Sequence, residues 1–147
     1  MFADISMFGI AAMNLFTYGS LMFDEVWSRL VRGDYLQRPG RLHGFIRRRV
    51  RDDVYPVIFK SGNGVWVDGV VYFGIGEEDL RRLDAFEGQA YDRQTHAVVV
   101  EGGEKRPAEV YVLNEDFSHL VTDCEWDPQW FARTALGVFL SHYQGFR

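Results

Sequence analysis

Strand-like segments outnumber helical ones in this sequence, and the two kinds do not alternate regularly. Runs rich in β-branched and aromatic residues predict strands, and apolar residues at helical spacing predict helices. The expected strands cover residues 14–18, 41–51, 55–59, 65–75, 91–100 and 108–113, and the expected helices cover residues 22–31, 77–87 and 127–143. Regular alternation would favour a doubly wound parallel sheet. The irregular order instead predicts an α+β fold, a small closed or nearly closed six-stranded β-barrel with flanking helices.

Turn residues set several of these boundaries. The turn-rich segment Ser61–Gly64 separates two expected strands and predicts a hairpin between them. Gly88 ends the expected helix over residues 77–87. Asp127 followed by Pro128 is typical of a helix start, with a capping side chain and then proline in the first turn. We therefore expect the last helix to open there.

Composition limits the classes of function. The chain has 147 residues, 47% of them hydrophobic, which suits one domain spanning residues 1–147. A formal net charge of −5 argues against nucleic-acid binding, which draws on a basic surface. The single cysteine, Cys124, cannot form an internal disulfide, so we expect a reducing, cytoplasmic setting. No segment approaches the roughly 20 apolar residues of a membrane span, and we expect no membrane partner.

The first 13 residues are expected to form a loosely ordered N-terminal extension. The stretch is mildly apolar but contains Asp4 and no basic residue, unlike the charged start of a secretory signal. Because the first clear strand begins only at Asn14, Met7 and Met13 are possible starts besides Met1.

Glu87 occupies an unusual position on the expected helix over residues 77–87. At 100° per residue it falls roughly 20° from Leu80, inside the apolar arc that also holds Leu83 and Phe86. It also lies at the helix C-terminus, where the macrodipole disfavours a negative charge. Burial and dipole together should raise its pKa, which makes Glu87 a candidate for catalytic proton transfer. Alternatively, a glutamate at a frayed helix end turns to water or pairs with a cation such as Arg93.

The loop after the first strand is a candidate binding element. Tyr18, Gly19, Ser20 and Leu21 join that strand to the next helix, so backbone N–H groups can point into a cavity and hold an anionic or carbonyl oxygen. The alternative is an ordinary turn, in which Gly19 gives backbone freedom and Ser20 caps the helix.

Three further signals are weaker. Four arginines lie within residues 47–51, but strand alternation splits them between two faces and acidic residues follow, so a solvated edge strand is favoured over a phosphate site. The four histidines are isolated, without the spacing of metal ligands, and we expect no metal site. The apolar stripe of the last helix suits the core or a dimer contact.

An ordered series of short motifs resembles the γ-glutamylcyclotransferase-like family, in particular its AIG2-like branch. The loop motif Y-G-S-L, the motifs L-x-G-F, Y-P-x-I and V-x-G-x-V-Y, and the block L-D-x-F-E-G-x-x-Y-x-R are matched in order by Tyr18–Leu21, Leu42–Phe45, Tyr55–Ile58, Val67–Tyr72 and Leu83–Arg93. Each string alone is weak, and their order and spacing make the match specific. The resemblance covers about Leu15 to Leu113.

The resemblance implies a mixed barrel with a cavity lined by the Tyr18–Leu21 loop, and it identifies Glu87 with the family's conserved glutamate. The implied reaction cyclises a small-molecule γ-glutamyl amine or peptide to 5-oxoproline, with Glu87 as general acid/base and no metal or organic cofactor. Tyr91 is a weaker expectation as a substrate contact; Arg93 lies on the same expected strand face, and Tyr111 is left unassigned. As a partner we expect only the substrate, in a monomer or weak homodimer.

A second interpretation stays open. The same cavity could belong to a non-catalytic protein that binds a small molecule or takes part in interactions, because a fold does not fix a function. The leaving amine is also undetermined, since the family spans γ-glutamyl amino acids, glutathione-like peptides and γ-glutamyl-lysine.

Overall fold

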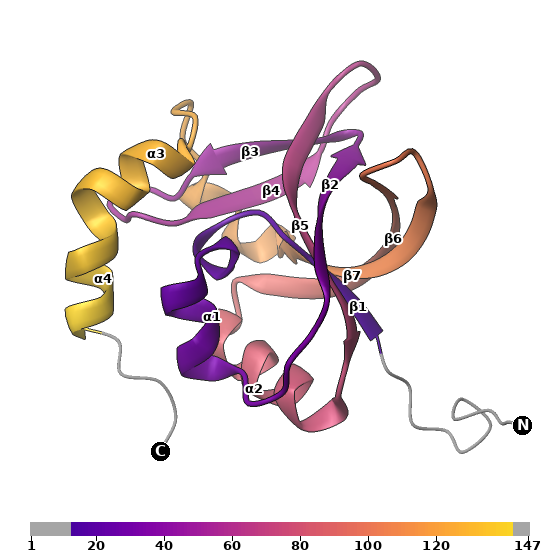
Figure 1. Cartoon of the computed structure of the whole chain (residues 1–147). Coiled ribbons are helices and arrows are strands. Elements are labelled where there is room, and N and C mark those ends of the chain that lie inside the picture. The colour runs from indigo at the N-terminus through magenta and orange to yellow at the C-terminus, as the bar shows by residue number, and fades with distance from the viewer. Residues whose placement is uncertain (1–12, 143–147) are drawn as a thin grey trace, which may run out of the picture.

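The computed structural model describes residues 13–142, coloured from indigo to yellow in Figure 1. The expected extension over residues 1–13 lies outside the described part except for its last residue, as do Met1 and Met7. Met13 is the first residue of the first strand, one position earlier than expected.

Five strands form a closed barrel. They are β1 (Met13–Thr17), β2 (Gln37–His43), β5 (Trp66–Ile75), β6 (Tyr91–Val100) and β7 (Lys105–Leu113), in the order β1-β5-β2-β6-β7. All pairs are antiparallel except β1 with β7, which run parallel and close the ring. Buried side chains from every strand form the barrel core: Phe16, Leu42, Val71, Val98 and Val110. The predicted α+β fold with a small mixed barrel and flanking helices is confirmed.

The barrel has five strands rather than six, because two strands pair in a sheet of their own. β3 (Phe45–Arg49) and β4 (Pro56–Lys60) are antiparallel partners. The strand expected over residues 41–51 is split by Gly44, whose φ of 84° turns the chain out of β2. The hairpin expected around Ser61–Gly64 is also wrong. β5 has β1 on one side and β2 on the other, so it offers β4 no free edge.

The helices begin and end close to the expected residues. α2 (Glu77–Glu87) starts with three acidic residues and is capped by Gly88, whose φ of 77° suits glycine. The helix expected over residues 22–31 is a 3-10 turn at Ser20–Met22 followed by α1 (Asp24–Leu30). The last helix opens at Asp127 as predicted and comprises α3 (Pro128–Trp130), a π-helical turn at 131–135 and α4 (Leu136–His142).

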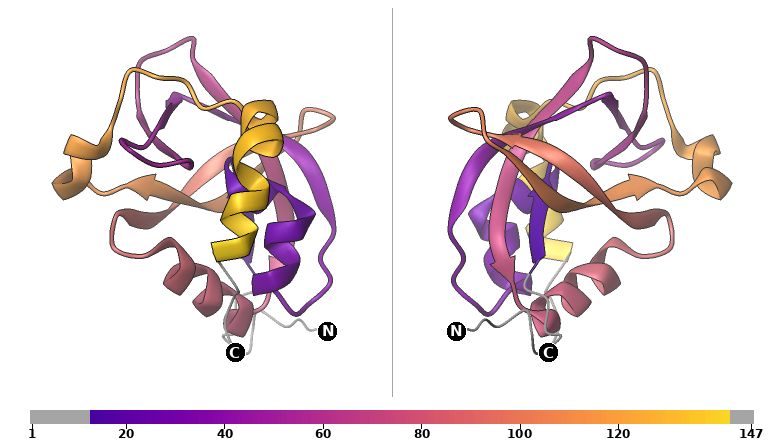
Figure 2. Two further views of the ribbon diagram at one scale, coloured as in Figure 1. Left: turned by 90° about the vertical axis from the view of Figure 1, so that its left-hand side faces the viewer. Right: turned by 90° about the vertical axis from the view of Figure 1, so that its right-hand side faces the viewer.

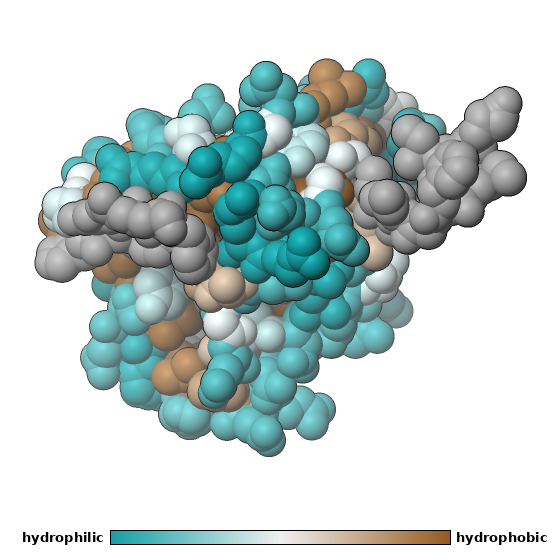
Figure 3. Space-filling view, turned by 90° about the horizontal axis from the view of Figure 1, so that it is seen from below, coloured by the Kyte–Doolittle hydropathy of each residue, from teal (hydrophilic) through white to brown (hydrophobic). Residues whose placement is uncertain are grey.

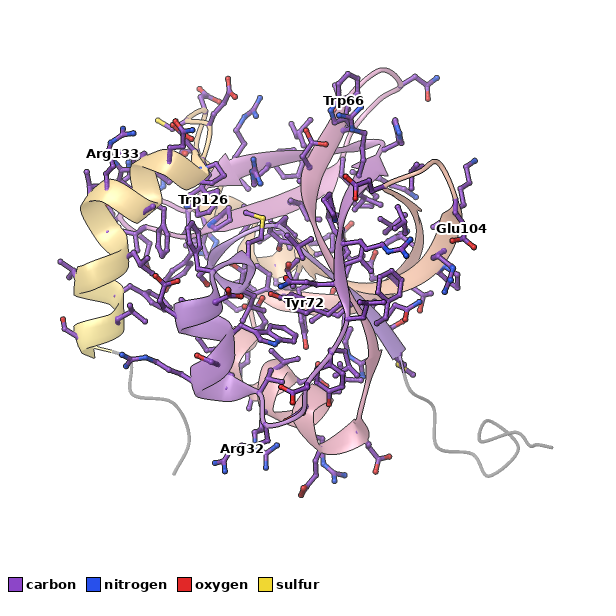
Figure 4. All side chains as sticks on the ribbon, viewed as in Figure 1. Arg32, Trp66, Tyr72, Glu104, Trp126 and Arg133 are labelled. Atoms are coloured by element: carbon purple, nitrogen blue, oxygen red, sulfur yellow. The ribbon has the colours of Figure 1, made fainter. Side chains whose placement is uncertain are left out.

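The helices pack on one side of the barrel, and α4 lies beside α1 (Figure 2). Trp27 of α1 stacks on Tyr72 of β5, with ring centroids 3.7 Å apart. The Arg29 guanidinium donates to the carbonyl of Leu140 at 3.2 Å. Trp126, just before the last helix, is 2% exposed and donates from its ring nitrogen to the Val54 carbonyl (Figure 4). These contacts join α1 to the barrel, α4 to α1, and the segment before the last helix to the loop between β3 and β4.

The underside of the molecule is largely hydrophilic, with hydrophobic residues in small separate patches (Figure 3). No helix within residues 13–142 is both long and apolar enough to cross a membrane.

Candidate functional site

A cavity of about 240 Å³ opens where the end of β1 meets the end of α2. The start of β4, the strands β6 and β7 and the last helix complete its walls. One carboxylate lies among side chains that are apolar or carry hydroxyl groups. The lining residues are Phe16, Thr17, Tyr18, Gly19, Ser20, Leu21, Tyr55, Pro56, Phe86, Glu87, Tyr91, Tyr111 and Phe139. The cavity therefore brings together every residue that the sequence singled out as catalytic or substrate-binding.

Glu87 is the last residue of α2 and is partly exposed, with the cavity beside it. Its carboxyl group receives no hydrogen bond and forms no ion pair with any residue between 13 and 142. Burial, and secondarily the negative charge of Asp84, raise the pKa of Glu87 from 4.5 to about 8. Near neutral pH this carboxyl group can both accept and donate a proton.

The pairing considered for Glu87 in the sequence does not occur, because Arg93 is held elsewhere. Its guanidinium contacts Asp84 at 2.9 Å and Glu109 at 2.6 Å. For the same reason Arg93 does not share the cavity with Tyr91, as strand alternation had suggested. Two carboxylates outside the cavity attract the arginine, and Glu87 is left without a cation.

Four tyrosines surround the carboxyl group, and their hydroxyls donate to other acceptors, that of Tyr55 to Asp53. Tyr18 donates to the carbonyl of Tyr111, Tyr91 to the carbonyl of Pro56 at 2.8 Å, and Tyr111 to Asp84 at 2.7 Å. Burial is the main cause that raises the pKa of Tyr18, Tyr91 and Tyr111. It also raises the pKa of Tyr55 to about 12. Among the lining residues, Glu87 is thus the one group that changes charge near neutral pH.

The loop facing Glu87 offers free backbone donors. The N–H groups of Gly19, Ser20 and Leu21 donate to no acceptor in the described part of the chain. The ordinary turn considered earlier is not what forms, since neither the 3-10 turn nor α1 has a side-chain cap, and Ser20 is buried within the 3-10 turn. Gly19 instead permits close packing, because an added Cβ would lie 2.8 Å from the Pro56 ring. The loop can hold an oxygen that carries negative charge.

Arg47 supports this loop from behind, and the sequence did not predict that role. Its guanidinium donates to the carbonyl of Tyr18 at 2.8 Å and to that of Asp68 at 3.3 Å, and lies 5.2 Å from the ring centroid of Trp126. Within the basic run Arg47 is therefore not solvated, because it is half-buried between the loop and Trp126, whereas Arg51 is exposed and β3 pairs with β4 alone in a two-stranded sheet. Sequence alternation gave no sign of these long-range partners.

Other lining residues were missed for the same reason. Tyr111 was left unassigned and Phe139 was placed in an apolar stripe, yet both reach the cavity from distant segments. Tyr55 and Pro56 carried a signal, because they form part of a matched motif. Cys124 is exposed and lies outside the cavity. Across residues 13–142 no group of three His, Cys, Asp or Glu side chains could hold a metal ion.

Comparison with known proteins identifies the family of this chain. The family model for γ-glutamyl cyclotransferase, AIG2-like, matches residues 15–128. AIG2-like protein C from Arabidopsis thaliana is 40% identical over 121 residues, covering 81% of this chain and 69% of that protein. The solution structure of an Arabidopsis thaliana protein has a TM-score of 0.68 at 30% identity, covering 88% of this chain and 78% of that one.

A structure of a γ-glutamyl cyclotransferase shares the fold, with a TM-score of 0.62 at 21% identity over 69% of this chain and 66% of that one. The sequence motifs, the barrel and the cavity lead to the same assignment as the family model, which spans most of the chain. This protein belongs to the γ-glutamyl cyclotransferase, AIG2-like family.

Proposed function

We propose that this protein cyclises the γ-glutamyl group of a small amine or peptide to 5-oxoproline and releases the amine, with Glu87 as general acid/base. One observation carries the proposal. Within residues 13–142 the Glu87 carboxyl group has no hydrogen bond or ion pair, burial is the main cause that raises its pKa to about 8, and it shares a cavity with three backbone N–H groups that donate to no acceptor in that range. Such a carboxyl group suits proton transfer at neutral pH.

The reaction moves two protons from the substrate's α-ammonium to the released amine, and Glu87 can carry them one after the other. The substrate's α-ammonium must lose a proton before its nitrogen attacks the γ-carbonyl carbon of the same glutamyl group, and the Glu87 carboxylate accepts that proton. Attack forms the C–N bond of a five-membered ring and a tetrahedral intermediate. As the original amide C–N bond breaks, the protonated Glu87 donates its proton to the leaving nitrogen. The ring nitrogen still carries two hydrogens, so it gives its extra proton to the Glu87 carboxylate, which passes it to the released amine and is ionised again for the next turnover. Because nucleophile and carbonyl belong to one molecule, proximity supplies much of the rate.

The loop Tyr18–Leu21 has the complementary role. In this proposal the N–H groups of Gly19, Ser20 and Leu21 hold the glutamyl group and stabilise the negative oxygen of the intermediate. Arg47 fixes the loop from behind by donating to the Tyr18 carbonyl, an acceptor of the same loop. Tyr91, whose hydroxyl is bound to Pro56, contributes a rigid wall for the substrate.

The test is a panel of γ-glutamyl compounds assayed for 5-oxoproline by mass spectrometry. It should include γ-glutamyl amino acids, a γ-glutamyl tripeptide and γ-glutamyl-lysine, with an α-glutamyl dipeptide as a control that has no γ-amide to cleave. We expect 5-oxoproline from the wild type with at least one γ-glutamyl compound, and release from Glu87→Gln that is slower by about 100-fold or more.

Two results would contradict the proposal in different ways. A Glu87→Gln variant that released 5-oxoproline as fast as the wild type would remove the assigned role of the carboxyl group. Binding of γ-glutamyl compounds without turnover of any would instead support the non-catalytic interpretation, in which the cavity only holds a ligand.

A further inference from the structure

A second hollow lies beside the cavity, along the last helix. This groove has a volume of about 630 Å³ and is lined by Asp53, Val54, Tyr55, Trp130, Thr134, Ala135, Val138 and Phe139. Tyr55 and Phe139 line both the groove and the cavity, so the two hollows share a wall. Five of the eight lining residues follow residue 128, where the match to the family model ends. The groove therefore depends on a helix that the family match does not include.

The sizes of the two hollows suggest that each holds a different part of the substrate. Pockets that enclose a drug-sized ligand usually measure roughly 300 to 1,000 Å³. At about 240 Å³ the cavity is smaller than that range, whereas the groove, at about 630 Å³, lies within it. A glutamyl group held at Glu87 would fill the cavity, and the remainder of the substrate would extend past the shared residues into the groove.

The chemistry of the groove is mainly apolar. Val54, Ala135, Val138 and the aromatic rings form most of its surface, and its one acidic group is Asp53. The Asp53 carboxylate accepts a hydrogen bond from the N–H of Val54 at 3.1 Å. No lysine or arginine belongs to the lining. The groove therefore offers contact area to an apolar group but no cation to a charged one.

Trp130 gives the groove a fixed aromatic wall. The Arg49 guanidinium lies over its ring, 4.1 Å from the centroid, and also donates to the Asp53 carbonyl at 2.9 Å. A cation stacked on an indole ring restrains it, and an aromatic wall that is already ordered binds apolar groups with little loss of side-chain entropy.

We propose that this groove is the subsite for the leaving amine, and that it selects amines carrying a bulky apolar group, aromatic ones above all. The inference rests on the proposed function, because it takes the glutamyl group to lie at Glu87. It goes beyond that function by naming the class of leaving group and the residues that recognise it.

The test compares two ligands that differ only in a phenyl group, γ-glutamyl-phenylalanine and γ-glutamyl-alanine. Binding is measured by calorimetry with Glu87→Gln, which keeps the ligand intact, and turnover is measured with the wild type. We expect the phenylalanine compound to bind about tenfold more tightly, and to be turned over with a kcat/KM higher by about the same factor, as is typical of an apolar pocket.

Val138→Asp tests the groove itself. Val138 is 59% exposed on α4, so the substitution adds a charge to the groove without disturbing the core. We expect the ratio of the two affinities to fall toward one. The matched control is Leu36→Asp, which changes another exposed apolar residue, 66% exposed and outside both hollows, and should leave the ratio as in the wild type.

The outcomes separate this inference from the proposed function. Equal affinity for the two ligands, or a preference that survives Val138→Asp, overturns the groove assignment even if turnover is observed. Absence of 5-oxoproline with every ligand overturns the enzymatic proposal, while the binding comparison still decides whether the groove recognises the phenyl group.

Discussion

The two ends of α2 hold shielded carboxylates with opposite surroundings. Asp79, in the first turn, is 5% exposed and accepts hydrogen bonds from the N–H groups of Arg32 and Gly33 and from the Tyr35 hydroxyl, and it pairs with Arg82 at 2.8 Å. Glu87, in the last turn, has none of these. Burial alone would raise the pKa of Asp79, but the hydrogen bonds and the Arg82 cation outweigh it and lower that pKa. For Glu87 nothing offsets burial.

The difference shows that burial by itself does not mark a reactive carboxylate. An acid at a helix N-terminus is stabilised by the macrodipole, and with satisfied oxygens it serves structure. An acid at the C-terminus without partners is strained in its charged form and available for proton exchange. The comparison predicts that replacing Glu87 lowers catalysis, whereas replacing Asp79 lowers stability.

The largest expected effect is on catalysis at the C-terminal end. Glu87→Gln keeps the shape but removes the proton shuttle, and kcat should fall by about 10²- to 10⁴-fold, the usual contribution of general acid/base catalysis. Stability should not fall. Because the pKa of Glu87 is raised from 4.5 to about 8, the wild-type protein becomes less stable as pH rises from about 4.5 to about 8. The Glu87→Gln variant lacks this titrating group and does not lose stability for this reason.

Measuring kcat beside the thermal midpoint at pH 6 and pH 8 checks both parts. Glu78→Gln, an exposed residue of the same helix, is the matched control and should change neither. A Glu87→Gln protein that unfolded more readily than the wild type at pH 8 would show that the carboxylate has structural partners after all.

Next in size is a loss of stability at the N-terminal end. Asp79→Ala leaves three donors and the Arg82 cation without their acceptor, and should lower the free energy of unfolding by about 3 kcal/mol. Urea denaturation measures this. The exposed Asp34→Ala is the control, expected to stay near the wild-type value. A comparable loss with Glu87→Gln, or none with Asp79→Ala, would erase the contrast between the two ends.

Sequence patterns predicted the parts of this contrast that depend on local spacing. The acidic start of α2, its end at Gly88 and the inward position of Glu87 follow from helical geometry over eleven residues. The Tyr18–Leu21 loop and Glu87 were both identified, the second from its helix position and from the matched motifs. These features can be predicted from sequence because each depends only on residues within one or two helical turns.

The remaining features depend on contacts between distant segments. That Glu87 lacks a partner follows from Arg93 being bound by Asp84 and Glu109, which the sequence cannot show. The pairing of β3 with β4 depends on which strand edges are already occupied. Arg47 reaches the Tyr18 carbonyl across 29 positions of sequence. Helical or strand periodicity carries no information on such distances.

A smaller effect is expected across the cavity from Glu87. Gly19→Ala places a Cβ 2.8 Å from the Pro56 ring, so the loop or the proline must move. Displacing a positioning element by about 1 Å can cost up to roughly 100-fold in rate, and we expect kcat/KM to fall by about 10- to 100-fold. Gly62→Ala, whose Cβ would meet nothing within 4 Å, controls for the substitution itself. Full activity of Gly19→Ala would mean that the loop does not position the substrate.

The smallest effect concerns the tuning of Glu87 by its own helix. Asp84 lies one turn before Glu87, and its negative charge adds to the burial that raises the Glu87 pKa to about 8. Glu87 must be ionised to accept the substrate's proton, so kcat/KM should rise with pH as the carboxyl group loses its proton. Asp84→Asn removes the repelling charge, lowers the Glu87 pKa and moves this rise to lower pH. A pH profile of kcat/KM measures the shift, with the exposed Asp92→Asn as control. If kcat/KM of Asp84→Asn rises at the same pH as that of the wild type, the Asp84 charge does not set the pKa of Glu87. Burial alone would then distinguish the carboxylate at the C-terminal end of α2 from the one at its N-terminal end.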